Sequence, residues 1–165
     1  MIWKTARMAT LGLCVLMLVV AGCDKAPKDS GKLAPAAKKE HDHPDKGPHG
    51  GPFAEWGDEE YHVEFTVDHD KKEATVYILG PDAKTHKAID TRELILALKT
   101  EPLEKIIMKP VPQADQGDKD GNSSRFVGTH EVLGKKMEFE GTVSGKVGKT
   151  PYSGDFKEKA EAHKH

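Results

Sequence analysis

The side chains best suited to chemistry lie close together in a short histidine-rich stretch. His41, Asp42, His43 and Asp45 form its first part, and His49 follows within the sequence GPHGG. Neutral imidazole binds Zn, Cu and Ni ions, and a carboxylate can complete a four-coordinate shell around such an ion. The stretch therefore predicts binding of a Cu, Zn or Ni ion, with these five side chains as the candidate ligands.

The spacing of these ligands limits what the site can be. It matches no rigid zinc site, and no predicted strand or helix holds the side chains in place. We therefore expect modest affinity and loose metal selectivity. The alternative is a polar spacer in which the histidines serve only solubility. His163 and His165 form a second, weaker pair of candidate ligands at the C-terminal end.

The first 22 residues have the pattern of an export signal. Lys4 and Arg7 precede an almost wholly apolar stretch, residues 8–20, which small residues and Cys23 follow. Positive, apolar and small-residue regions in this order are typical of a signal peptide. The apolar stretch is shorter than the roughly 20 residues that cross a bilayer. We therefore predict a signal peptide over residues 1–22.

The end of this signal has a recognisable sequence, VAGC, at residues 20–23. It resembles the lipobox of bacterial lipoproteins, whose cysteine is acylated and becomes the first residue of the mature chain. The resemblance implies that Cys23 carries fatty acyl chains and anchors the protein to a membrane of the cell envelope, periplasmic or surface-facing. Cys14 lies in the signal, so Cys23 has no partner for an internal disulfide. The alternative is a plain secreted protein with an incidental Cys23.

The segment that follows, residues 23–51, is rich in Pro, Ala, Lys and Asp and is predicted to be a disordered tether. Its end, residues 41–51, resembles a stretch before the first β-strand of periplasmic adaptor subunits from heavy-metal efflux pumps. It also resembles uncharacterised small bacterial lipoproteins with histidine-rich tethers. The helical hairpin and barrel of such adaptors have no counterpart in this sequence. The resemblance therefore implies only a shared N-terminal module.

Residues 52–157 alternate between apolar and polar side chains, the pattern of half-buried strands. We predict an all-β domain, a small antiparallel β-sandwich of immunoglobulin-like type, followed by a disordered tail at residues 158–165. The predicted strands cover residues 61–67, 74–79, 84–89, 94–98, 106–108, 124–127, 136–147 and 151–156. A single helical turn is expected near residues 130–133.

The same alternation assigns individual side chains. His62 falls on the face opposite Tyr61 and Val63, so we expect it to point to solvent or to a sheet edge. His69, His86 and His130 fall in turns or near a loop and are expected to be ordinary surface residues. Trp56 is expected to close one end of the core.

Several functional classes are disfavoured. Residues 145–150 suggest a phosphate-binding loop, but Val143 stands where that motif needs glycine. Residues 118–121, with the sequence DKDG, resemble part of a calcium-binding loop. In that alignment Gln116 and Val127 stand at positions where the loop needs its first and last acidic ligands, which excludes an EF-hand. No GxSxG motif for a nucleophile occurs. The net charge of −2, without a basic stripe, argues against a nucleic-acid partner.

These observations favour a membrane-anchored exported lipoprotein with a non-catalytic accessory or binding role. The alternative is a structural module that docks on a protein partner in the envelope and uses the tether as a plain spacer. A hydrolase remains a third reading only if the fold brings His62 or His130 beside a carboxylate in a cleft.

Overall fold

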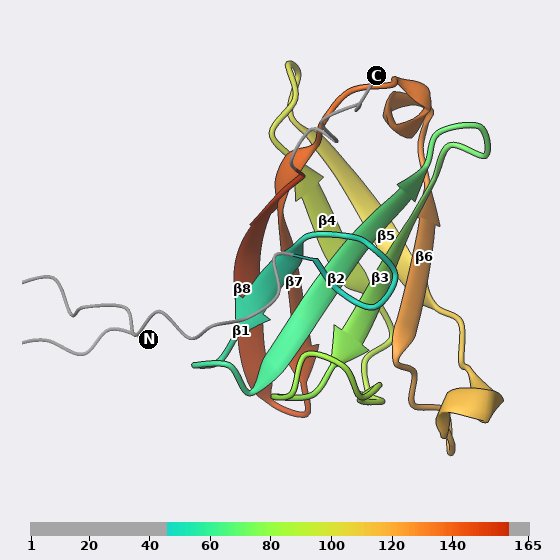
Figure 1. Cartoon of the computed structure of the whole chain (residues 1–165), viewed down its shortest axis with the longest axis vertical. Coiled ribbons are helices and arrows are strands. Elements are labelled where there is room, and N and C mark those ends of the chain that lie inside the picture. Colours follow the sequence, from blue (N-terminus) through green and yellow to red (C-terminus); the bar gives the residue numbers. More distant parts are fainter. Residues whose placement is uncertain (1–45, 159–165) are drawn as a thin grey trace, which may run out of the picture. The chain divides into compact units, whose positions relative to one another are not determined.

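The computed structural model describes residues 46–158 of the chain. Eight antiparallel strands and two short 3-10 helices account for its regular structure (Figure 1). In chain order they are β1 (Phe53–Trp56), β2 (Tyr61–Asp68), β3 (Glu73–Leu79), β4 (Leu94–Leu98), β5 (Glu104–Pro110), η1 (Ala114–Gln116), β6 (Arg125–Thr129), η2 (Glu131–Gly134), β7 (Glu140–Val147) and β8 (Thr150–Lys157). The predicted all-β, antiparallel class is confirmed.

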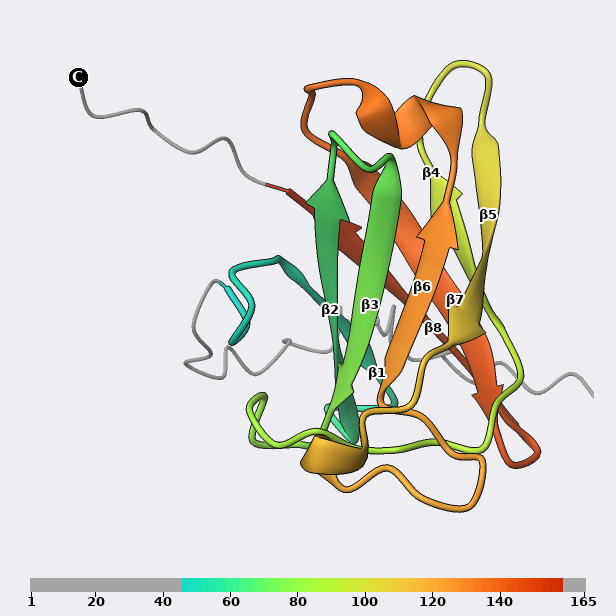
Figure 2. The same ribbon diagram turned by 90° about the vertical axis from the view of Figure 1, so that its right-hand side faces the viewer.

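The strands form one sheet in the order β1-β2-β3-β6-β5-β4-β7-β8. The ladder between β5 and β6 has only two residue pairs, Lys109 with Val127 and Pro110 with Phe126. The sheet curls, so that its two halves lie on opposite sides of the core (Figure 2). Because this short ladder joins the halves into one sheet, the predicted immunoglobulin-like arrangement of two separate sheets is not confirmed.

The outer strands β1 and β8 also approach each other. A Cβ added at Gly154 in β8 would lie 2.5 Å from the carbonyl oxygen of Glu55 in β1. A side chain larger than hydrogen therefore does not fit at this contact. Because β1 and β8 lie this close together, the curled sheet is nearly closed.

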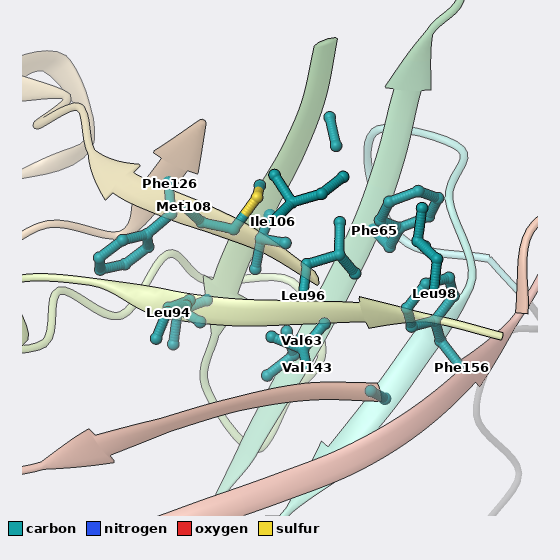
Figure 3. Close-up of a cluster of buried hydrophobic side chains, with 14 of the residues drawn as sticks. Val63, Phe65, Leu94, Leu96, Leu98, Ile106, Met108, Phe126, Val143 and Phe156 are labelled. Carbon is teal, nitrogen blue, oxygen red and sulfur yellow. The ribbon is translucent and has the colours of Figure 1, made fainter. Parts of the chain in front are cut away.

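Apolar side chains from both halves fill the space between them (Figure 3). In β4, Leu94, Leu96 and Leu98 are completely buried, whereas Ile95 between them is exposed. This is the alternation expected of a strand with one buried face. Figure 3 shows these leucines among side chains of the other strands, including Phe65 and Phe156.

Trp56 closes one end of this core, as the sequence predicted. Its side chain has no exposed surface, and its indole Nε1–H donates a hydrogen bond to the carbonyl oxygen of Val143 at 3.1 Å. The indole also stacks on Tyr152. Because Trp56 is in β1, Val143 in β7 and Tyr152 in β8, these contacts join the two ends of the sheet.

Most predicted strands are present within a few residues of their expected bounds, and η2 lies where a helical turn was expected. The exception is residues 84–89, which form only two isolated pairs, Leu79 with His86 and Ile89 with Ser123. This segment instead crosses from β3 to β4 as a loop. Strand β1 and helix η1 were not predicted as elements, because a four-residue strand and a single helical turn carry too few residues for a periodic pattern.

The prediction for His62 was wrong. His62 is only 1% exposed, although it lies on the face of β2 opposite Val63. Its Nδ1–H donates to the carbonyl oxygen of Gly80 at 3.1 Å, and its ring packs edge-on against Phe53. The outer face of β2 is therefore covered by other parts of the chain, so alternation alone does not predict exposure there.

Candidate functional site

A buried carboxylate lies at the centre of the candidate site. Glu64 is in the middle of β2, on the same outer face as His62, and its side chain has no exposed surface. Its Oε1 accepts hydrogen bonds from the backbone N–H groups of His49 at 2.8 Å and Gly51 at 2.9 Å. Its Oε2 lies 2.8 Å from Nδ1 of His49. Burying a carboxylate is costly without such partners, and these three contacts supply them.

The sequence GPHGG, residues 47–51, allows the chain to wrap around this carboxylate. A turn is closed by the backbone N–H of Gly47, which donates to the carbonyl oxygen of Gly51. A Cβ added at Gly47 would lie 2.3 Å from the carboxyl carbon of Glu64, and one at Gly51 would lie 1.8 Å from the carbonyl oxygen of Phe65. Gly50 has a φ of 86°, a conformation that other residues adopt at a cost. Glycine is therefore required at residues 47 and 51 because β2 lies too close for a side chain, and at residue 50 because of its backbone conformation.

The imidazole of His49 is fixed by a second contact. It stacks on the ring of Tyr77, with centroids 3.6 Å apart and planes within 4° of parallel. Tyr77 in β3 is the direct cross-strand partner of Glu64 in β2. Glu64 therefore contacts an edge of the His49 ring and Tyr77 contacts a face of it. The His49 side chain remains 30% exposed.

A second histidine lies beside this ring. The His86 ring is edge-on to His49, with centroids 5.4 Å apart, and edge-on to Tyr77 at 5.9 Å. Its Nδ1 is 3.4 Å from the hydroxyl of Ser124. Burial, followed by the neighbouring His49, lowers the pKa of His86, which favours the neutral imidazole that binds metals. We call His49, Glu64, Tyr77 and His86 the histidine cluster.

The loop that carries His86 is held by Asp82. The carboxylate of Asp82 accepts hydrogen bonds from the backbone N–H groups of Lys84 and Thr85 and from the Thr85 hydroxyl. The hydrogen bonds from Thr85 lower the pKa of Asp82 to about 2. Gly80 closes the loop by donating its N–H to the carbonyl oxygen of Thr85. His86, next in the chain, therefore follows an ordered turn.

The hydrogen bond to Glu64 decides what His49 can do chemically. An ionised carboxylate only accepts hydrogen bonds, so Nδ1 of His49 is the donor, and in the neutral imidazole the lone pair is then on Nε2. Metal-binding histidines commonly donate their other ring nitrogen to a carboxylate in this way. Among residues 46–158, Nε2 of His49 has no hydrogen-bond partner. The imidazole is thus oriented and available as a ligand.

Of the metal ligands predicted from sequence, only His49 is among the described residues. The others, His41, Asp42, His43 and Asp45, lie outside that range, as do Cys23 and the pair His163 and His165.

The predicted tether extended to Gly51, yet from Gly47 onward the chain lies against the sheet. The hydrogen bonds to Glu64 are the physical reason. Sequence reasoning missed Glu64, Tyr77 and His86. The three glycines of GPHGG were the feature of the sequence that could have indicated a close approach of residues 47–51 to another part of the chain.

The remaining histidines of residues 46–158 do not join the cluster. Nε2 of His130 is 3.6 Å from the carboxylate of Glu104, and its Nδ1 accepts the N–H of Val132 at the start of η2. His69 donates Nδ1–H to the carbonyl oxygen of Leu133 at the other end of β2. Neither His62 nor His130 lines the groove found between β4, β7 and β8.

That groove is the second notable surface. Its lining includes Arg92, Ile95, Lys146 and Tyr152. Ile95 is 42% exposed, and its cross-strand partner Ile107 is 56% exposed. Two exposed branched side chains therefore lie next to each other beside this groove.

Comparisons with protein-family models, with curated proteins and with solved structures find no match for this chain. Over residues 46–158, no helix is long and apolar enough to cross a membrane. In the same part of the chain, no three His, Cys, Asp or Glu side chains are grouped so as to hold a metal ion by themselves. The histidine cluster, which contains two imidazoles, is therefore not such a group by itself.

Proposed function

We propose that this protein is an exported lipoprotein, anchored to a membrane of the cell envelope through acylated Cys23, that binds a Cu, Zn or Ni ion without catalysing a reaction. The histidine-rich stretch supplies the ligands His41, His43 and His49, with Asp42 and Asp45 completing the shell. The observation that carries the proposal is the contact between Nδ1 of His49 and the buried carboxylate of Glu64. It supports the proposal because it orients the imidazole with its other nitrogen open.

In this proposal different segments of the chain have different roles. The lipid anchor keeps the protein at the membrane, and the segment after it lets the β-domain extend away from the membrane. The β-domain holds the C-terminal end of the histidine-rich stretch in a defined place, through residues 47–51. A ligand fixed in this way loses less conformational freedom when an ion binds.

Calorimetric titration of the full chain in detergent with Cu(II) or Zn(II) tests this function. We expect binding in the micromolar range for the natural sequence. Simultaneous replacement of His41, His43 and His49 by alanine should remove most of the heat. The matched control replaces His69 and His130 by alanine, because both are histidines outside the stretch and the cluster. Identical heats for the natural chain and the first variant would contradict the proposal.

A second candidate function is binding of a protein partner by the β-domain, with the tether serving only as a spacer. The exposed pair Ile95 and Ile107 beside the groove favours it. This hypothesis expects an envelope partner whose binding survives deletion of residues 38–45, which leaves residues 47–51 on the sheet, and is lost in Ile95→Glu/Ile107→Glu. Loss of the partner on deletion of residues 38–45 would count against it. We expect no nucleic-acid partner under either function.

A further inference from the structure

We propose that His86 is a second ligand of the same metal ion, so that His49 and His86 form a two-histidine site on the outer face of β2 and β3. The inference rests on the proposed metal-binding function and assigns to it a residue that lies far from the histidine-rich stretch in sequence. It also assigns Glu64 and Tyr77 as positioning residues for the site.

The first step in the argument is the orientation of His49. Glu64 engages Nδ1 at 2.8 Å, and Tyr77 covers one face of the ring at a centroid distance of 3.6 Å. The two contacts come from neighbouring strands and together restrict both rotations of the side chain. Nε2 is then the atom of His49 that can bind an ion. A site whose ligand is held in this way has the support that metal sites require around their ligands.

The second step is the distance between the two rings. With metal–nitrogen bonds of about 2.0–2.1 Å, two imidazoles on one tetrahedral ion have ring centroids roughly 5 Å apart. The centroids of His49 and His86 are 5.4 Å apart, with the ring planes nearly perpendicular at 88°. The separation of the two rings is therefore close to that of two imidazole ligands of one ion.

The third step is the support behind His86. Ser124, whose hydroxyl lies near Nδ1 of His86, is itself buried, and its carbonyl oxygen accepts the N–H of Ile78 in β3. On the other side, the turn held by Asp82 fixes the chain immediately before His86. Within residues 46–158, Nε2 of His86 makes no hydrogen bond. Both histidines thus have one supported nitrogen and one available nitrogen.

The fourth step is the electrostatic surrounding. The carboxylates of Glu64, Asp115 and Asp118 all act on His86 through space, with His49 as the neighbouring imidazole. Carboxylates that act on His86 favour a cation over an anion. Two imidazoles favour Cu, Zn or Ni over Ca or Mg, which prefer oxygen ligands.

A purely structural role for His49 is the competing explanation. Stacking on Tyr77 and bonding to Glu64 would by themselves help to dock residues 47–51 on the sheet. That explanation accounts for the contacts of His49, but it gives no role to the adjacent His86. The two explanations differ in one observable, the effect of His86 on metal binding.

The test uses Cu(II) as the probe and the full chain in detergent, followed by equilibrium titration and electron paramagnetic resonance. His41, His43, His163 and His165 are first replaced by alanine, so that His49 and His86 are the only histidines that remain among the candidate ligands named from the sequence and the structure. We expect weakened but measurable Cu(II) binding with nitrogen hyperfine structure. Adding His86→Ala should lower the affinity at least as much as the loss of an outer partner, which is roughly 10- to 100-fold. Glu64→Gln should lower it by roughly 10- to 100-fold as well.

His69→Ala in the same background is the matched control, because His69 also uses Nδ1 in a hydrogen bond but lies at the other end of β2. His86→Asn replaces His86→Ala if the alanine variant does not fold, as judged by circular dichroism. Unchanged affinity and spectrum in the His86 variant would overturn the two-histidine site and leave the proposed function standing. Absence of Cu(II) binding by the natural full chain would instead overturn the proposed function itself.

Discussion

The Nδ1 atom of His49 lies 2.8 Å from Oε2 of Glu64, a carboxylate with no exposed surface in the middle of β2. This contact joins the end of the histidine-rich stretch to the folded domain. The same carboxylate accepts the backbone N–H groups of His49 and Gly51. One side chain therefore both fixes the path of residues 47–51 and orients the imidazole.

Replacing Glu64 by Gln should destabilise the domain. The amide oxygen can still accept the two backbone N–H groups, but the amide NH2 then faces Nδ1 of His49, so the hydrogen bond from the imidazole to a charged acceptor is lost. We expect the free energy of unfolding to fall by about 1–3 kcal/mol. Urea unfolding followed by the fluorescence of Trp56 measures it. Glu55→Gln in the neighbouring strand β1 is the control, because Glu55 is exposed and should change little. Equal stability of the two variants would contradict the role of Glu64.

Replacing Gly51 by Ala should displace residues 47–51 from the sheet. Its Cβ would lie 1.8 Å from the carbonyl oxygen of Phe65, a backbone atom that cannot move aside cheaply. We expect a loss of about 1–3 kcal/mol, the usual cost of forcing an extra methyl group into a packed site. Gly80→Ala is the matched control, since its nearest neighbour would be 3.6 Å away. Crosspeaks of His49 and Tyr77 in NMR spectra should shift only in the Gly51 variant.

Asp82 should give the domain a small acid-dependent stability. Its hydrogen bonds from Thr85 lower its pKa from 3.8 to about 2 in the folded protein. A lowered folded pKa stabilises the fold above pH 3.8, and this contribution disappears as the pH falls from 3.8 towards 2. The natural chain should therefore be more stable than Thr85→Val at pH 6, and the gap should close near pH 2.

Urea unfolding of both proteins between pH 6 and pH 2 measures this gap. The gap should stay small at every pH because Asp82 is exposed to solvent. Thr91→Val is the control, because the hydroxyl of Thr91 donates to the backbone carbonyl of Glu93 and has no carboxylate partner. A gap between the natural chain and Thr85→Val that does not depend on pH would contradict the assigned role of Asp82.

Much of the fold followed from the pattern of side chains. The apolar run LILAL at residues 94–98 predicted β4 at its observed bounds. The break between the predicted strands at residues 136–147 and 151–156 correctly separated β7 from β8. Both are local signals, carried by residues adjacent in sequence.

The histidine cluster could not be predicted in the same way, because its residues come from four separate segments. His62 and Glu64 occupy positions of β2 that alternation assigns to solvent, yet both are buried. Their burial depends on residues 47–51 and the loop after β3 covering the outer face. Such covering is a tertiary effect that periodicity does not contain. The same limit applies to the joining of β5 and β6, on which the single sheet depends.

The proposed anchor makes a separate prediction. Mass spectrometry of membrane fractions should find a chain that begins with Cys23 and carries acyl groups. Cys23→Ala should move the protein to the soluble fraction, because two or more acyl chains are needed for stable anchoring and this variant has none. Cys14→Ala is the control and should leave the protein in the membrane fraction. A Cys23 variant that stays membrane-bound would contradict lipid anchoring.

The state of the His49 ring can be read directly from the nitrogen chemical shifts of the imidazole, recorded for the full chain before and after addition of Zn(II). Contact with Glu64 should place the proton on Nδ1, so the metal-free spectrum should show an unprotonated Nε2. On addition of Zn(II), the Nε2 signal of His49 should shift while Nδ1 keeps its proton. A proton on Nε2 in the metal-free protein, or an Nε2 signal that Zn(II) leaves unchanged, would contradict the assignment of His49 as an oriented metal ligand.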